Sequence, residues 1–256
     1  MNHARGTRLI HWLIASLKQC FAVAVLGAAL LTTAALGDDK VPEGATAAKG
    51  ASISGVEAEK APREGIADEA GFVSLFNGRD LTGWDGSGWT VEDGVMVCHG
   101  GFLTWRQQQF TNFILRFEVK LSPGANNGLN FRSRNSYWNE IQILDETHPG
   151  YATIHDYQAP GSLYGVAAAR RGVSKPVGQW NSQEVMADGT HIKVTLNGAV
   201  VVDADLSKLD LDKCLDGAAH PGLRDPSGDL GWLGHLNADE KEGPVYLRNL
   251  RIKILP

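Results

Sequence analysis

Hydrophobic and polar residues alternate with a period of two along most of the chain after residue 70, and no other feature constrains the fold as strongly. Successive side chains of a β-strand point to opposite faces, so strict alternation predicts strands with one buried face. The clearest runs are residues 113–121, 129–132, 140–143 and 191–196. No segment shows a convincing amphipathic-helix pattern. The sequence therefore predicts an all-β domain.

Turn signals separate these runs at Asp93-Gly94, Ser122-Pro123-Gly124, Asp188-Gly189 and Asn197-Gly198. The last of them, flanked by Leu196 and Val200, predicts a two-residue β-hairpin. Between residues 245 and 255 the alternation changes phase, which predicts a bulge near Arg248-Asn249. Many short strands at this spacing indicate a β-sandwich or a β-barrel.

The first 37 residues contain, in the order found in export signals, a basic segment, an apolar segment and a cleavage pattern. A basic segment containing Arg5, Arg8 and Lys18 leads into a run, Cys20 to Leu36, of almost wholly apolar or small residues. A small-x-small cleavage pattern then ends at Gly37. We expect cleavage and a secreted or periplasmic protein. The alternative is a retained membrane anchor, although the apolar run is at the short end for spanning a bilayer.

Residues 38–70 are rich in Ala, Gly, Glu and Lys and carry almost no large apolar side chain. Such a segment cannot bury enough surface to fold alone, so we expect a disordered linker before a domain at residues 71–256. Removing residues 1–37 leaves 21 Lys and Arg against 29 Asp and Glu, a net charge of −8. An acidic chain is not expected to bind nucleic acid, because binding the phosphate backbone requires stripes of Lys and Arg on the protein surface.

Two cysteines, Cys98 and Cys214, remain after that cleavage. An oxidising compartment would permit a disulfide. Because Cys98 lies inside a strand pattern, the interpretation as a small buried core residue is favoured. No His or Cys spacing predicts a metal site, and no nucleotide-binding or serine-hydrolase motif is present. The sequence therefore indicates no cofactor.

Polar residues lie at unusual positions on two neighbouring strands. Asn130 and Arg132 are expected on one face of the first strand, and Trp138, Glu140 and Gln142 on one face of the second, with Asp145 at its end. The short loop between the strands predicts that they pair, which would make Arg132 and Glu140 cross-strand neighbours. Aromatic, amide and carboxylate side chains together are typical of a sugar site. The alternative is an ordinary solvated strand face with one ion pair.

Several segments resemble the 3-keto-disaccharide hydrolase domain family in chain order. Residues 72–84 resemble its opening SLFNGKDLTGW, residues 89–94 its W.VEDGV turn, 126–132 its GGNSGIFFR segment and 140–145 its QILD strand. Further matches lie at residues 162–165, 175–181, 196–198 and 245–255. The resemblance implies a two-sheet antiparallel jelly-roll sandwich of the concanavalin A-like kind. It also implies export and action on oxidised sugars.

For such an activity the resemblance implies removal of the acidic C2 hydrogen of a 3-keto sugar, loss of the C1 substituent and addition of water. The candidate catalytic residues are Glu140 as the base, Asp145 as the alternative base, and Arg132 to stabilise charge. The candidate substrate-binding residues are Asn127, Asn130, Tyr137, Trp138, Gln142, Tyr164 and Lys175. The rival functions are a non-catalytic carbohydrate-binding module and an interaction domain tethered at the cell envelope.

Overall fold

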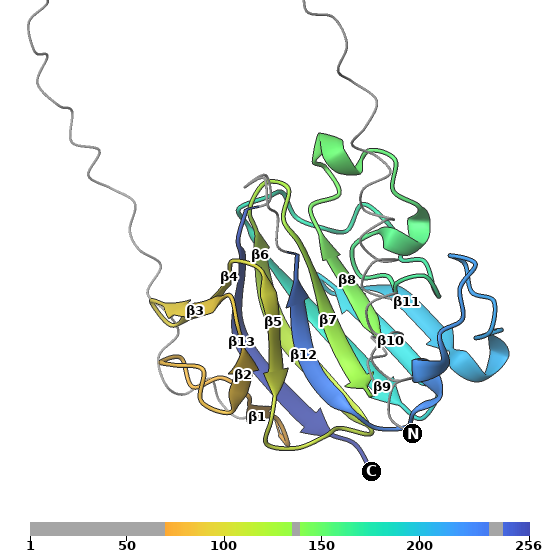
Figure 1. Ribbon diagram of the computed structural model, residues 1–256, viewed down its shortest axis with the longest axis horizontal. Coiled ribbons are helices and arrows are strands. Elements are labelled where there is room, and N and C mark those ends of the chain that lie inside the picture. Colours follow the sequence, from red (N-terminus) through yellow and green to blue (C-terminus); the bar gives the residue numbers. More distant parts are fainter. Residues whose placement is uncertain (1–69, 135–138, 236–242) are drawn as a thin grey trace, which may run out of the picture. The chain divides into compact units, whose positions relative to one another are not determined.

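The computed structural model describes residues 70–134, 139–235 and 243–256, which form two antiparallel β-sheets packed face to face (Figure 1). The predicted signal segment (1–37) and all of the predicted linker (38–70) except residue 70 lie outside the described residues, as do Tyr137 and Trp138. None of the described helices is long and apolar enough to cross a membrane. The described helices are four short 3-10 turns: η1 (Pro149–Tyr151), η2 (Asp156–Gln158), η3 (Leu206–Lys208) and η4 (Pro221–Arg224).

The larger sheet contains eight strands. Their order is β11 (Ala199–Asp205), β10 (His191–Leu196), β9 (Trp180–Asp188), β6 (Phe113–Leu121), β13 (Val245–Ile254), β4 (Val95–Cys98) and β3 (Trp89–Glu92), and β1 (Val73–Ser74) also pairs with β13. The smaller sheet contains five strands, in the order β2 (Trp84–Gly86), β5 (Gly101–Trp105), β12 (Asp229–Gly234), β7 (Asn126–Ser133) and β8 (Glu140–Leu144).

The core lies between the sheets and is built from alternate residues of facing strands. Phe117 of β6 meets Trp232 of β12 edge to face, with ring centroids 4.8 Å apart. Phe113 packs in the same way on Phe131 of β7 at 6.4 Å. Burying each such side chain contributes roughly 1.5–3 kcal/mol. The inward positions of β7 and β8 are thereby assigned, and their other residues must face away from the larger sheet.

The predicted all-β, two-sheet jelly-roll architecture is confirmed. The Asn197-Gly198 hairpin joins β10 to β11, and both residues take positive φ, 50° and 79°, as such a tight turn requires. The predicted bulge is also present, because the pairing of β13 with β6 shifts between Arg248 and Arg251 and Asn249 has φ of 55°.

Candidate functional site

One row of polar side chains crosses the outer face of the smaller sheet, the face that points away from the larger sheet. The antiparallel register places Asn130 of β7 directly opposite Glu140 of β8. On the other side of β8, the Tyr164 N–H donates to the Glu140 carbonyl at 2.9 Å. A bridge between Ile141 and Leu163 fixes this register, so Tyr164 shares the outer face with Glu140. We call Asn130, Glu140 and Tyr164 the polar row.

The carboxyl group of Glu140 lies against the backbone of Gly128 in β7. A β-carbon at Gly128 would fall only 2.2 Å from Glu140 Oε1, so a larger residue at this position would displace the carboxylate. A glycine inside a strand often marks such a close approach. Burial raises the pKa of Glu140 to about 7. The carboxyl is therefore poised to exchange a proton near neutral pH.

Amide groups beside Glu140 are buried without protein partners. Among the described residues, neither Oδ1 nor Nδ2 of Asn130 has a hydrogen-bond partner, although Asn130 is only 2% exposed. The same holds for Oδ1 of Asn126, two residues before Gly128. Leaving such groups unpaired costs about 1–3 kcal/mol each, so unpaired groups gathered on one surface indicate a place for water or ligand.

Tyr164 is held at the edge of the smaller sheet by its neighbours. Gln158 Nε2 donates to the Tyr164 hydroxyl oxygen at 2.9 Å. Tyr157 packs edge to face on the Tyr164 ring, with centroids 6.2 Å apart. These contacts fix the phenol on the side of Glu140 away from Asn130.

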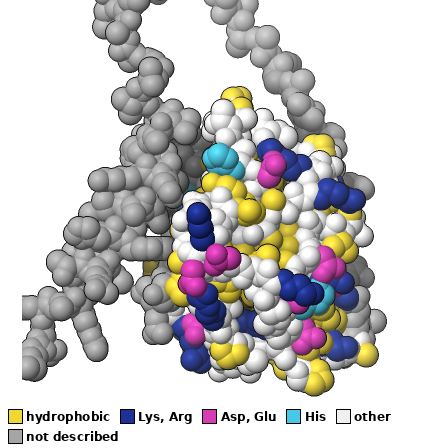
Figure 2. Space-filling view, turned by 90° about the vertical axis from the view of Figure 1, so that its right-hand side faces the viewer, with side chains coloured by type: hydrophobic (Ala, Val, Ile, Leu, Met, Phe, Trp, Pro, Cys, Tyr) yellow, Lys and Arg dark blue, Asp and Glu magenta, His cyan; other side chains and the backbone are white. Residues whose placement is uncertain are grey.

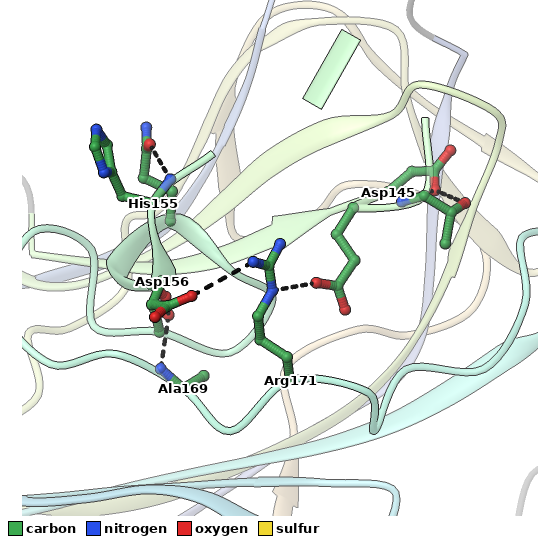
Figure 3. Close-up of polar contacts among 9 residues, drawn as sticks. Asp145, His155, Asp156, Ala169 and Arg171 are labelled. Atoms are coloured by element: carbon green, nitrogen blue, oxygen red, sulfur yellow. Dashed lines mark hydrogen bonds and ion pairs between the residues drawn. The ribbon is translucent and has the colours of Figure 1, made fainter. Parts of the chain in front are cut away.

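A network of polar contacts organises the loop between β8 and Tyr164 (Figure 3). Arg171 Nε donates to Glu146 at 2.9 Å, and its Nη1 lies 3.4 Å from Asp156. The hydroxyl of Ser162 donates to the Asp156 carbonyl at 3.0 Å. The loop is thereby tied to the segment that carries Tyr164, which helps to position the polar row.

Asp145, the alternative base in the sequence prediction, stabilises a turn (Figure 3). Its Oδ2 accepts from the Gly124 N–H at 2.9 Å, and its Oδ1 accepts from the N–H and the hydroxyl of Thr147 at 3.0 and 2.6 Å. Burial opposes ionisation of this carboxyl, but the hydrogen bonds from Thr147 and Gly124 prevail and lower its pKa. Asp145 is therefore an ionised group with both oxygens engaged.

Arg132 is not a neighbour of Glu140, and the predicted cross-strand pair is wrong. Two residues of β7, Phe131 and Arg132, lie opposite one residue of β12, and Arg132 has φ of 47°. This bulge interrupts the alternation, so Arg132 leaves the face that carries Asn130.

The guanidinium of Arg132 instead connects the two sheets. It donates to the carbonyls of Thr111 and Gly189, both at 2.7 Å, and to Asn112 Oδ1 at 3.2 Å. It also lines a cavity of about 490 Å³ whose walls include Leu206 and Leu223. The contacts of Arg132 are those of a structural residue.

Three further predicted binding residues form their hydrogen bonds with groups outside the polar row. Gln142 shares the outer face with Glu140, but its Oε1 accepts from the N–H of Ile143 at 3.0 Å. Asn127 points inward, where its Nδ2 donates to Cys98 Sγ at 3.3 Å across the space between the sheets. Lys175 donates to the carbonyl of Trp180 at the start of β9, in the larger sheet. Its contacts do not include the polar row.

The structure adds a histidine–aspartate pair that the sequence did not single out. His220 Nε2 lies 2.9 Å from Asp216 Oδ2, and both side chains are mostly buried. A β-carbon at Gly165, the residue after Tyr164, would lie 2.8 Å from this imidazole nitrogen. The pKa of Tyr157 is raised by burial and by the Asp216 charge. This pair therefore borders the tyrosine end of the polar row.

Cys98 and Cys214 are both free, and Cys98 is buried as the preferred interpretation predicted. Burial raises the pKa of Cys98 to about 11, so its thiol stays protonated. Within residues 70–134, 139–235 and 243–256, no group of three His, Cys, Asp or Glu side chains is arranged to hold a metal ion. On the side of the molecule shown in Figure 2, acidic and basic side chains are interspersed.

Comparison with known proteins gives consistent matches over the same part of the chain. The model of the 3-keto-alpha-glucoside-1,2-lyase-like domain family matches residues 71–253. A relative, the 3-keto-disaccharide hydrolase of Bacteroides thetaiotaomicron, is 25% identical over 235 residues, which cover 73% of this chain and 80% of the relative.

Two similar solved structures are candidate glycosyl hydrolases from Parabacteroides distasonis. One has a TM-score of 0.64 and 26% identity, and the alignment covers 72% of this chain and 99% of that one. The other has a TM-score of 0.59 and 23% identity, with 73% and 94% covered. The fold is thus shared across almost the whole of both structures.

Proposed function

The chain belongs to the 3-keto-alpha-glucoside-1,2-lyase-like domain family, and from this premise we propose that it cleaves 3-keto-glycosides, with 3-keto-disaccharides as the principal substrates. The reaction is a base-catalysed elimination across C1 and C2 followed by addition of water. The relative from Bacteroides thetaiotaomicron, named as a 3-keto-disaccharide hydrolase, supports this substrate class.

The observation that carries the proposal is the environment of Glu140. Its carboxyl is buried against Gly128, has a pKa near 7 and adjoins the unpaired amide of Asn130. A base near neutrality is matched to removing a carbon-bound proton that a neighbouring ketone acidifies. A merely solvated carboxylate on a sheet face would keep an ordinary pKa, so this environment favours an enzyme over a binding module.

In the proposed reaction Glu140 takes the proton from C2 of the 3-keto sugar, and the electron pair of that bond is delocalised onto the ketone oxygen. The enolate then expels the C1 substituent, whose oxygen takes from Glu140 the proton that was removed from C2. Water adds across the resulting C1–C2 double bond, with hydroxyl joining C1 and a proton returning to C2. The products are those of hydrolysis, and Glu140 ends in its starting form.

The neighbours of Glu140 supply hydrogen bonds to the charge that develops. Asn130 Nδ2 is an unused donor beside the carboxyl, and the Tyr164 phenol lies on the other side. Donors fixed in a buried site stabilise an enolate more than water does, because they need no reorientation during the reaction. Asp145 and Arg132 receive no catalytic role, because their polar atoms are engaged elsewhere.

We also propose that the basic and apolar order of residues 1–37 directs export of the chain and is then removed. The N-terminal sequence of the protein recovered from a periplasmic or culture fraction tests this proposal. A start near residue 38 supports cleavage, whereas an intact first residue in the membrane fraction supports the anchor.

The test of function is incubation of the purified protein with 3-keto-trehalose, 3-keto-lactose and the two parent disaccharides, following release of free sugar. We expect cleavage of the keto forms alone. No cleavage of any of them, with binding still measured by calorimetry, would contradict the enzyme and support a carbohydrate-binding module.

A further inference from the structure

The outer face of the smaller sheet continues beyond the polar row, across β12 to β5. The register aligns Gly128 of β7 with Leu233 of β12, and Leu233 with Phe102 of β5. These three residues and Gln142 of β8, which is opposite Gly128, therefore form a second row beside the first. Since the Glu140 carboxyl lies over Gly128, this second row leads directly away from the proposed base.

Exposure increases along the second row in one direction. Gln142 and Gly128 are buried, Leu233 is half-buried, and Phe102 is 45% exposed. Phe102 is the most exposed aromatic side chain among the described residues. Toward β8 the face is closed by the loop that carries Ser162, whose side chain is fully buried. Among the described residues this row is therefore closed toward β8 and open toward β5, the direction in which a second sugar ring could extend.

The spacing along this row suits a second sugar ring. Adjacent strands lie about 4.8 Å apart, so Phe102, two strands from Gly128, stands roughly 10 Å from the Glu140 carboxyl. This separation is comparable with the length of a disaccharide. The apolar face of a pyranose ring stacks on aromatic and aliphatic side chains, and Phe102 and Leu233 provide both.

We propose that Phe102 and Leu233 form a second subsite, which binds the ring attached at C1 of the 3-keto sugar while Glu140 acts on the first ring. The proposal rests on the proposed function and deepens it, since it makes the protein selective for disaccharides over one-ring glycosides. The subsite binds by stacking and takes no part in proton transfer.

The test compares Phe102→Ala and Phe102→Tyr with the wild type on two substrates, 3-keto-lactose and methyl 3-keto-glucoside. We expect Phe102→Ala to raise KM for the disaccharide about tenfold and to leave the methyl glycoside unchanged, as loss of one apolar contact in a binding site would. Phe102→Tyr retains the ring and should keep the wild-type KM. Val200→Ala, at an equally exposed apolar position on β11 of the larger sheet, is the matched control.

The outcomes of this test distinguish a failure of the proposed function from a failure of the proposed subsite. A wild type that cleaves neither substrate overturns the proposed function and the subsite with it. A wild type that cleaves both, with Phe102→Ala weakening both by the same factor or neither, overturns the subsite alone. Thermal melts of all four proteins show whether any loss reflects misfolding.

Discussion

The outer faces of the two sheets are both polar, but their polar groups are satisfied in opposite ways. On the larger sheet Arg248 lies 2.6 Å from Glu118, and Arg116 lies 2.6 Å from Glu184. The guanidinium of Arg248 also stacks over the Trp180 ring, 4.1 Å from its centroid. These groups are partly exposed and paired with one another, which is the usual condition of a solvated strand face.

On the smaller sheet the corresponding face carries amide groups that are buried and unpaired. Glu140 contacts a glycine backbone, and both amide atoms of Asn130 have no partner among the described residues. Folding alone gains nothing from this arrangement, because each buried unpaired group lowers stability. The pairing of polar residues on a strand face, more than their presence there, therefore distinguishes a candidate site from an ordinary surface.

The largest difference between the two faces is expected when one carboxylate on each is neutralised. Glu140→Gln should lower kcat/KM on 3-keto-disaccharides by about a thousandfold or more, since an amide cannot accept the C2 proton. Glu118→Gln, on the paired face, should leave kcat/KM within about twofold. Equal losses in the two variants, measured by sugar release, would remove the functional distinction between the faces.

A second test moves the carboxylate without changing its chemistry. Gly128→Ala places a methyl group only 2.2 Å from the present position of Glu140 Oε1, so the flexible Glu140 side chain must shift. A displacement of about 1 Å can cost about a hundredfold in rate, so we expect a loss of this size in kcat. Circular dichroism should show the native fold. Full activity in Gly128→Ala would show that the position of this carboxyl is unimportant.

A third test concerns Arg132. The sequence predicted a catalytic role for it, whereas its hydrogen bonds in the structure connect the two sheets. Arg132→Ala leaves the carbonyls of Thr111 and Gly189 without a donor, and we expect a loss of about 2–4 kcal/mol in unfolding free energy. The kcat of the folded protein should stay near the wild-type value. A lowered kcat with unchanged stability in urea would return Arg132 to the active site.

The smallest expected effect is on the pH dependence of stability. The pKa of Glu140 is raised from 4.5 to about 7 in the folded state, so the folded protein holds this proton more tightly than the unfolded chain. The associated stability is present below pH 4.5 and is lost as pH rises through about 7. Glu140→Gln should therefore be more stable than wild type at pH 8, by about 1–3 kcal/mol, and similar at pH 4.

Urea unfolding at the two pH values measures this difference, with Glu118→Gln as the control. If Glu140→Gln shows no gain at pH 8, the carboxyl is not the buried, proton-holding group described above.

Much of the fold was predictable because alternation is a local property. The predicted strand at residues 113–121 is β6, and the pairing of β7 with β8 follows from their short connection. The position of Asn127 could also have been predicted. The alternation that buries Leu129 and Phe131 places Asn127 inside with them, so its assignment to the sugar site conflicted with a pattern already visible.

The remaining differences depend on features that no local pattern encodes. A single positive φ at Arg132 turns its side chain away from Glu140, and an arginine gives no sequence signal for this conformation. The Asp216–His220 pair meets Gly165 only because a loop folds back from the larger sheet, and loop histidines look alike in a sequence. Glu140 could be placed opposite a polar residue of β7 because its strand alternates clearly, and its role as the base stays a prediction.

Proton abstraction by Glu140 can be followed at the C2 hydrogen of a 3-keto-disaccharide in D₂O by proton NMR, with wild type, Glu140→Gln and Glu118→Gln. If Glu140 is the base, wild type and Glu118→Gln should give product deuterated at C2, while Glu140→Gln should leave the substrate and its C2 hydrogen intact. Deuterium at C2 with Glu140→Gln at the wild-type rate, or product without deuterium from the wild type, would contradict this role of Glu140.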